Sequence, residues 1–119
     1  MRKKVVGRKF HRKTDVRKAF LRSLARSLIL HEKIKTTEAR AKEVARFVQK
    51  YITKAKKGDL HSIRQIASDF YNDRELVKKL VQDIGKRFQN RKGGYTRVIK
   101  LGQRKSDGAK MVIVELLKE

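Results

Sequence analysis

Apolar residues recur every four positions from Val16 to Leu28. This period predicts a helix over residues 14–32, with Thr14 as a candidate N-cap. Residues 33–37 alternate in polarity and are β-branched, which predicts a short strand directly after the helix.

Three further helices are predicted in the middle of the chain. Apolar positions three and four apart indicate a long helix that begins after Thr37, its candidate cap, and ends at Gly58. Asp59 is a candidate cap for a shorter helix. A third helix is predicted to open with a capping box at Asn72 and to stop at Gly85.

Beyond residue 85 the period changes from helical to alternating. Residues 95–101 and 111–117 are strand-like, and the segment 104–108 between them is rich in turn formers, so a β-hairpin is predicted. The nearly continuous apolar run 111–114 indicates the more buried strand, whereas 96–100 keeps charge on one side.

The order helix, strand, three helices, two strands predicts an α+β fold. It fits a two-layer domain with a three-stranded sheet and a C-terminal β-hairpin. Residues 14–119 would form this single domain. Residues 1–13 have no apolar period and are predicted to be a basic N-terminal arm.

The net charge and its distribution along the chain indicate the kind of partner that the protein binds. The 119 residues include 34 Lys and Arg against 12 Asp and Glu, a formal net charge of +22. Residues 1–22 contain Asp15 as their one acid, residues 86–110 contain only Asp107, and the segment between them mixes both signs. Two basic poles of this kind are typical of nucleic-acid-binding arms and loops.

Catalytic and metal chemistry find little support in the sequence. The chain has no cysteine, and its histidines at 11, 31 and 61 are far apart. His31-Glu32 does not begin an H-E-x-x-H motif, because Lys35 stands where the second histidine is needed. We therefore predict no metal, no cofactor, no small-molecule substrate and no enzymatic activity.

The sequence also bears on location. No apolar run approaches the roughly 20 residues of a membrane span. The charged segment 1–9 is not followed by the apolar core of a secretory signal, so a cytoplasmic protein is expected.

Two motifs in the second basic pole have two interpretations each. Gly93-Gly94 lies among cations, so its backbone could approach phosphate closely, or the pair could simply form a turn before a strand. It is not a P-loop, which requires a G-K-[ST] ending before a helix. Tyr95 could stack on a base, or it could pack against the sheet.

Several stretches together resemble the bacterial large-subunit ribosomal protein seventeen family. The resemblance covers nearly the whole chain and is carried by segments 7–9, 27–37, 41–43, 87–100 and 111–116. Two residues depart from the family pattern: Lys3 stands where histidine is often found, and Lys110 stands where proline is frequent. Both changes keep or add positive charge.

The resemblance implies a structural constituent of the large ribosomal subunit, acting in translation. Its partners would be large-subunit rRNA, toward the peptide-exit side, and neighbouring ribosomal proteins. The candidate RNA contacts are Arg2, Lys3, Lys4, Arg8, Lys9, Arg12 and Lys13 in the arm, Arg17 in the first helix, Lys35, Thr36 and Thr37 at the first strand, and Arg87, Arg91, Lys92, Gly93, Gly94, Tyr95, Arg97, Arg104 and Lys105 in the second pole.

Two other functions remain compatible with the composition. A general nucleic-acid-compacting protein of the chromatin type would carry a similar charge. A basic amphipathic membrane-surface protein would use residues 16–30 as its helix.

Overall fold

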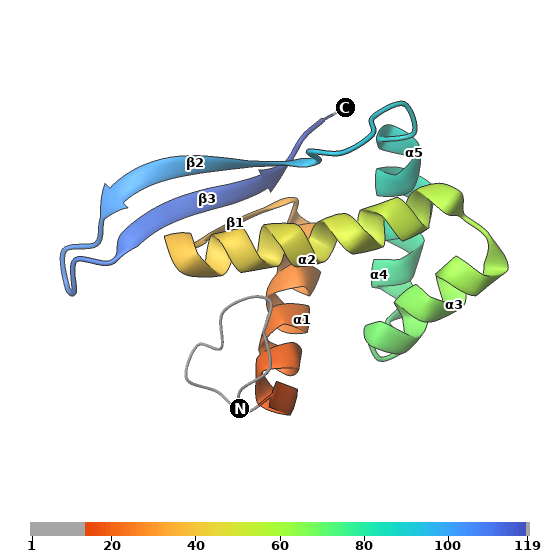
Figure 1. Ribbon diagram of the computed structural model, residues 1–119, viewed down its shortest axis with the longest axis horizontal. Helices are drawn as coiled ribbons and strands as arrows, with labels where there is room; N and C mark the ends of the chain where they lie inside the picture. The colour runs from red at the N-terminus through yellow and green to blue at the C-terminus, as the bar shows by residue number, and fades with distance from the viewer. Residues whose placement is uncertain (1–13, 119) are drawn as a thin grey trace, which may run out of the picture.

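The computed structural model describes residues 14–118. The predicted arm at 1–13 and the capping side chain of Thr14 lie outside the described part. The elements follow the predicted order (Figure 1). They are α1 (Thr14–His31), β1 (Lys33–Thr37), α2 (Glu38–Lys57), α3 (Leu60–Asp69), α4 (Arg74–Lys79), η1 (Leu80–Ile84), α5 (Gly85–Arg87), β2 (Thr96–Gln103) and β3 (Lys110–Leu116).

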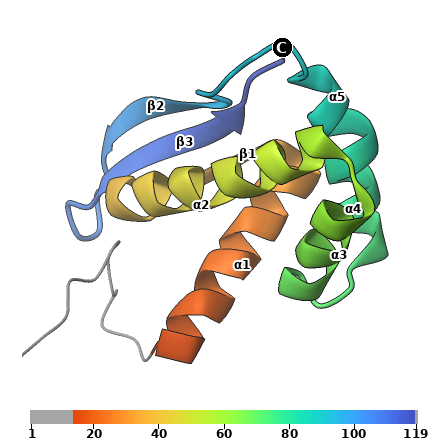
Figure 2. The ribbon, with the colours of Figure 1, turned by 45° about the vertical axis from the view of Figure 1, so that its right-hand side comes forward.

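The three strands form one antiparallel sheet in the order β1-β3-β2, so the last strand in the sequence is the central one. Val114 of β3 lies opposite Ile34 on one side and Val98 on the other. The sheet covers α2, and α1 crosses beneath α2 (Figures 1 and 2). The predicted α+β class is confirmed.

The core lies where α2 meets the sheet and the other helices. The α2 residues Val44, Val48 and Ile52 are fully buried, as the three-four spacing requires. They share one cluster with Leu28 and Ile29 of α1, Ile66 of α3, Leu76 of α4, Leu80 and Ile84 of η1, and Val112, Val114 and Leu116 of β3.

The helix caps agree with the sequence in part. Asp59 caps α3 as predicted, because its carboxylate accepts a hydrogen bond from the Ser62 N–H at 2.9 Å. Thr37 occupies the N-cap position of α2 but makes no side-chain capping bond. The predicted cap at Asn72 is wrong by one residue, since Asp73 accepts the bond from Leu76 N–H at 3.2 Å.

The predicted helix stop at Gly85 is also wrong. Gly85 has helical dihedral angles, and the helix continues through the π-turn η1 into α5. A Cβ atom on Gly85 would lie 2.9 Å from the carbonyl oxygen of Ala55 in α2. The glycine therefore lets two helices approach closely and does not end one.

The two hairpin strands differ in burial. Val112, Val114 and Leu116 of β3 point into the core, which confirms the prediction that β3 is the more buried strand. Every residue of β2 after Thr96 is exposed. A bulge between Lys100 and Gly102 shifts the register, and Gly102 takes a φ of +98°, a conformation that favours glycine.

Candidate nucleic-acid interface

The loop between α5 and β2 contains the Gly93-Gly94 pair. Gly94 has a φ of +62°, as the turn interpretation requires, and nothing lies within 4 Å of a Cβ built on either glycine. Arg91 Nε donates hydrogen bonds to the carbonyl oxygens of Gly93 and Gly94, each at 3.1 Å. Lys56 of α2 donates to the Arg91 carbonyl oxygen. Two cations thus bind carbonyl oxygens of the loop backbone, and open space lies beside its glycines.

Tyr95 ends this loop and belongs to the core. Its side chain is 1% exposed, and its ring lies 5.0 Å from the Phe88 ring, centroid to centroid. Its hydroxyl accepts a hydrogen bond from Lys56 Nζ at 3.0 Å. Of the two interpretations of Tyr95, the structure shows packing, and a ring in this position cannot stack on a base.

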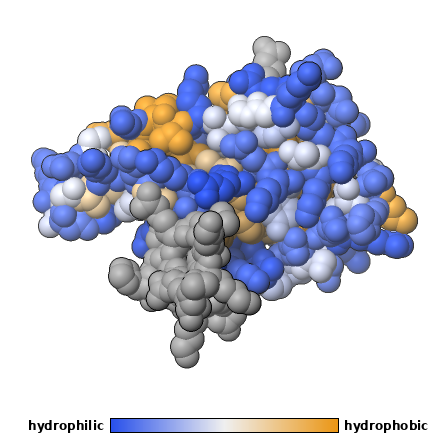
Figure 3. Space-filling view, in the orientation of Figure 1, coloured by the Kyte–Doolittle hydropathy of each residue, from blue (hydrophilic) through white to orange (hydrophobic). Residues whose placement is uncertain are grey.

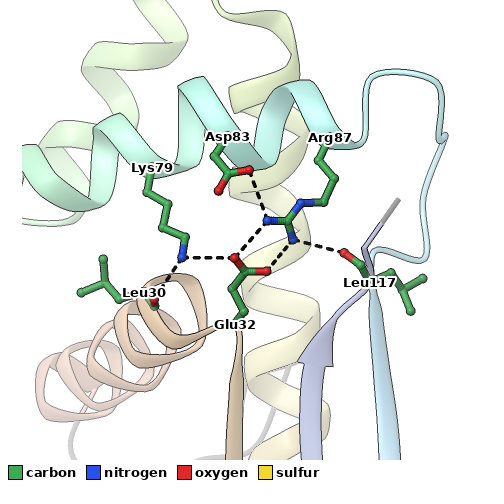
Figure 4. Close-up of polar contacts among 6 residues, drawn as sticks. All are labelled: Leu30, Glu32, Lys79, Asp83, Arg87 and Leu117. Carbon is green, nitrogen blue, oxygen red and sulfur yellow. Dashed lines mark hydrogen bonds and ion pairs between the residues drawn. The ribbon is translucent and has the colours of Figure 1, made fainter.

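Arg87 is likewise used inside the fold (Figure 4). Its side chain is 14% exposed and forms a bidentate ion pair with Glu32, with N···O distances of 2.6 and 3.0 Å. It also donates to the Leu117 carbonyl oxygen at 3.2 Å. The Arg87 guanidinium, which the sequence predicted to contact RNA, is therefore bound by the Glu32 carboxylate and the Leu117 carbonyl oxygen of the protein itself.

Glu32 is the centre of this network, and sequence reasoning assigned it no such role. Lys79 Nζ lies 3.2 Å from its carboxylate, and the Glu32 carbonyl oxygen accepts from Leu116 N–H at 2.9 Å. The hydrogen bonds from Arg87 and then Lys79 lower the pKa of Glu32 to about 2, against the opposing effect of burial. A φ of +66° at Glu32 was not foreseeable from a pattern of apolar residues.

The strand β1 separates its three candidate residues. Thr36 is buried and lies opposite Val112, so its side chain faces the core. Lys35 is exposed on the outer face of the sheet, and Thr37 is partly buried at the start of α2. The strand alternation thus leaves Lys35 as the most accessible of the three side chains.

The outer face of the sheet combines cations with apolar side chains. Lys33, Glu115 and Arg97 lie in one cross-strand row, and Arg97 forms an ion pair with Glu115. The next row contains Lys35, Ile113 and Ile99. Figure 3 shows apolar surface at the hairpin, surrounded by hydrophilic side chains. Of the exposed large apolar residues of β2, Ile99 lies on this face, Val98 lies on the opposite face beside Val114, and Leu101 lies at the bulge.

The hairpin turn holds the last two candidates. Arg104 forms a bidentate ion pair with Asp107, at 2.7 and 3.0 Å, and its bonds lower the pKa of Asp107 to about 2. Lys105 is exposed beside this pair. The turn lies at the opposite end of β2 from the glycine loop (Figure 1). Eight strand residues separate them by roughly 26 Å.

The second basic pole is therefore spread along β2 and does not form one site. Arg87 and Tyr95 lie inside the fold, the glycine loop is at one end, and Lys105 is at the other. Arg17 lies elsewhere, near the start of α1, where it is partly buried. Within residues 14–118 no cluster of three or more metal-ligating side chains is found. No helix in this part of the chain is long and apolar enough to cross a membrane.

Comparison with known proteins decides the family. The family model described as "Ribosomal protein L17" matches residues 20–117. The chain belongs to the ribosomal protein L17 family. Membership agrees with the resemblance seen in the sequence, and it confirms the expectation of a structural ribosomal protein and not an enzyme.

Curated members of the family align with almost the whole chain. The large ribosomal subunit protein bL17 of Pelobacter propionicus is 49% identical over 113 residues, which cover 95% of this chain and 88% of the relative. The bL17 proteins of Clostridium botulinum (Hall) and Clostridium perfringens (SM101) are 49% and 50% identical over 110 residues, or 92% of this chain and 96% of each relative.

Proposed function

We propose that this protein is a structural component of the large ribosomal subunit that binds large-subunit rRNA through its N-terminal arm and the β2 region. The observation that carries the proposal is the charge distribution on the structure. The acids near β2 are each paired with a cation: Asp107 with Arg104, Glu115 with Arg97, and Glu38, which shares a hollow with Lys100 and Lys110, with Lys42. Exposed lysines remain along the strand and at both its ends, namely Lys92, Lys100, Lys105 and Lys110.

The mechanism forms and breaks no covalent bond. Lysines and arginines that replace condensed counterions lower the electrostatic cost of bringing RNA segments together. Because the cations lie at both ends of β2, the strand would bridge two phosphate groups roughly 26 Å apart. The glycine loop would offer its backbone to phosphate without an intervening side chain.

The arm is the second part of the proposal. Its seven cations, Arg2, Lys3, Lys4, Arg8, Lys9, Arg12 and Lys13, precede the start of α1 directly. Deleting residues 1–13 should leave the 14–118 fold intact and weaken incorporation into the large subunit. Sedimentation of the tagged, truncated protein with large subunits after a high-salt wash measures this.

Neighbouring ribosomal proteins are proposed as additional partners. The support is the exposed apolar side chains of Ile99, on the outer face of the sheet, and of Leu101 at the bulge, which phosphate cannot bury. A protein neighbour would cover them and leave the adjacent lysines to RNA. Photo-crosslinking from position 99 in assembled subunits should therefore yield protein adducts, and adducts with RNA alone would contradict this part.

Salt dependence tests the RNA contacts. The wild-type protein should bind transcribed large-subunit rRNA more tightly than duplex DNA of equal length at matched salt. Combined Lys92→Gln and Lys105→Gln changes should lower the slope of log affinity against log salt by roughly one unit per lost phosphate contact. Lys50→Gln is a matched control, because Lys50 is exposed on α2, far in the sequence from both poles. Equal affinity for DNA and rRNA would instead favour a general nucleic-acid compactor.

A further inference from the structure

Tyr71 is an exposed aromatic residue in a strained turn. It lies between α3 and α4 and has 67% of its surface exposed, more than any other large apolar residue described. Its φ is +56°, and that of the following Asn72 is +59°. Bulky side chains disfavour this left-handed region, and strained residues concentrate at functional sites.

The turn around Tyr71 is held firmly. Asn72 N–H donates to the Ala67 carbonyl oxygen at 2.7 Å, and Asp73 N–H donates to the Phe70 carbonyl oxygen at 3.1 Å. The preceding Phe70 is buried, with its ring 4.9 Å from that of Tyr51. Because Phe70 anchors the turn in the core, Tyr71 is presented outward without contributing its own burial to stability.

A hollow of about 340 Å³ lies between this turn and α1. Its lining includes the Tyr71 ring, Ala19 and Phe70 as apolar groups, and Ser23 and Arg22 as polar ones. Arg22 Nη1 donates to the Tyr71 hydroxyl at 3.0 Å, and its guanidinium carbon lies 5.3 Å from the ring centroid. An aromatic surface beside a guanidinium and hydroxyls suits a planar heterocycle with polar edges.

The charges around the hollow are mixed and mostly positive, since Asp69 of α3 also acts on Arg22. Arg22 and Arg26 face it from α1, and Arg74 follows the turn on α4. Asp73 on its rim is bound by Arg26 Nε at 2.6 Å, which lowers its pKa. Arg22 is eight residues beyond Thr14, so the hollow lies about 12 Å along α1 from the point where the arm ends.

We propose that Tyr71 is a stacking platform for an unpaired nucleobase of the bound RNA, which would lie on the ring face that Arg22 does not cover. The proposal rests on the proposed function, because it requires RNA held by the arm and body. It replaces the buried Tyr95 as the aromatic contact, and it places that contact on the helical side of the molecule, away from β2.

The test compares Tyr71→Ala with Tyr71→Phe in binding to transcribed large-subunit rRNA. Loss of one stacked base should weaken the alanine variant by roughly 5-fold to 150-fold. Phenylalanine keeps the ring and should bind within about 2-fold of wild type. The salt slope should stay unchanged in both, because neither change removes a phosphate contact. A phenylalanine variant as weak as alanine would assign the effect to the hydroxyl contact with Arg22, and an alanine variant within 2-fold of wild type would overturn stacking.

A glycine variant separates stacking from folding. Tyr71→Gly removes the ring and relieves the positive φ, so its thermal midpoint should equal or exceed that of wild type while its rRNA affinity falls as in Tyr71→Ala. A glycine variant that binds like wild type would contradict the proposal. Wild-type protein that does not prefer rRNA over duplex DNA would overturn the proposed function itself. A wild-type preference for rRNA together with unchanged rRNA affinity in Tyr71→Ala and Tyr71→Gly would overturn stacking alone.

Discussion

The strands β2 and β3 are hydrogen-bonded to each other, yet they belong to different environments. Val114 of β3 is 0% exposed, whereas its cross-strand partner Val98 is 40% exposed. β3 is central and lies over α2, while β2 is an edge strand. Backbone pairing therefore holds β2 in place without making it part of the core. Its side chains are left for contacts outside the molecule.

Removing the same side chain from each strand should give the largest contrast. Leu116 of β3 is 4% exposed and Leu101 of β2 is 47% exposed. We expect Leu116→Ala to lower the free energy of unfolding by about 3 kcal/mol, because it removes buried apolar atoms and leaves a cavity. Leu101→Ala should change it by no more than about 0.5 kcal/mol. Urea denaturation measures both, and equal losses would break the comparison.

Two glycines extend the comparison to the body and the loop before β2. A Cβ on Gly85 would meet the Ala55 carbonyl oxygen, whereas one on Gly93 meets nothing within 4 Å. Gly85→Ala should therefore lower the free energy of unfolding by about 2 kcal/mol through overpacking. Gly93→Ala should stay within about 0.5 kcal/mol of wild type. A stabilised Gly85→Ala protein would show that α2 and the η1–α5 segment can separate without cost.

Acid should weaken the body through the ion pairs of Glu32. The pKa of Glu32 falls from the usual 4.5 to about 2 on folding. Its stabilising contribution is thus complete above pH 4.5 and is lost as the pH falls toward 2. After discounting for solvent screening this is about 1–2 kcal/mol. The free energy of unfolding of wild type should decline more over this range than that of Glu32→Gln. Parallel pH profiles would contradict the assignment.

The smallest effect is expected at the exposed ion pair that joins β2 to β3. The Arg97 side chain is 63% exposed where it meets Glu115. Arg97→Gln should change the free energy of unfolding by less than about 0.5 kcal/mol, and less still at high salt. Chemical denaturation at two salt concentrations measures this. A larger loss would mean that the hairpin depends on the pair for its register.

Most elements were predictable because their periods are local. The four-residue spacing of α1 and the apolar run of β3 each describe a face that tertiary contacts then bury. Gly85 was misjudged because its role depends on Ala55, thirty positions earlier in another helix. Residue type indicated that Gly85 ends a helix, whereas the close helix crossing makes it an interior position.

The candidate interface was predictable in charge and less so in position. The excess of cations in 86–110 is a property of composition, so the sequence reveals it. Which cations face outward is not, because Arg87 is drawn into the fold by Glu32, fifty-five residues away. Tyr71 escaped attention for the converse reason: an aromatic residue between helices is usually core, and its exposure follows from two consecutive positive φ angles.

The strand order has a consequence for synthesis. β1 and β2 share no ladder, and each pairs only with β3, which follows both in the sequence. Until residues 110–116 have emerged during translation, neither earlier strand has its partner and the Glu32 carbonyl has no Leu116 N–H to accept. The three-stranded sheet can therefore form only after β3 has been synthesised. A chain interrupted before residue 110 contains the cations of β1 and β2 but lacks the central strand that holds these two strands in one sheet.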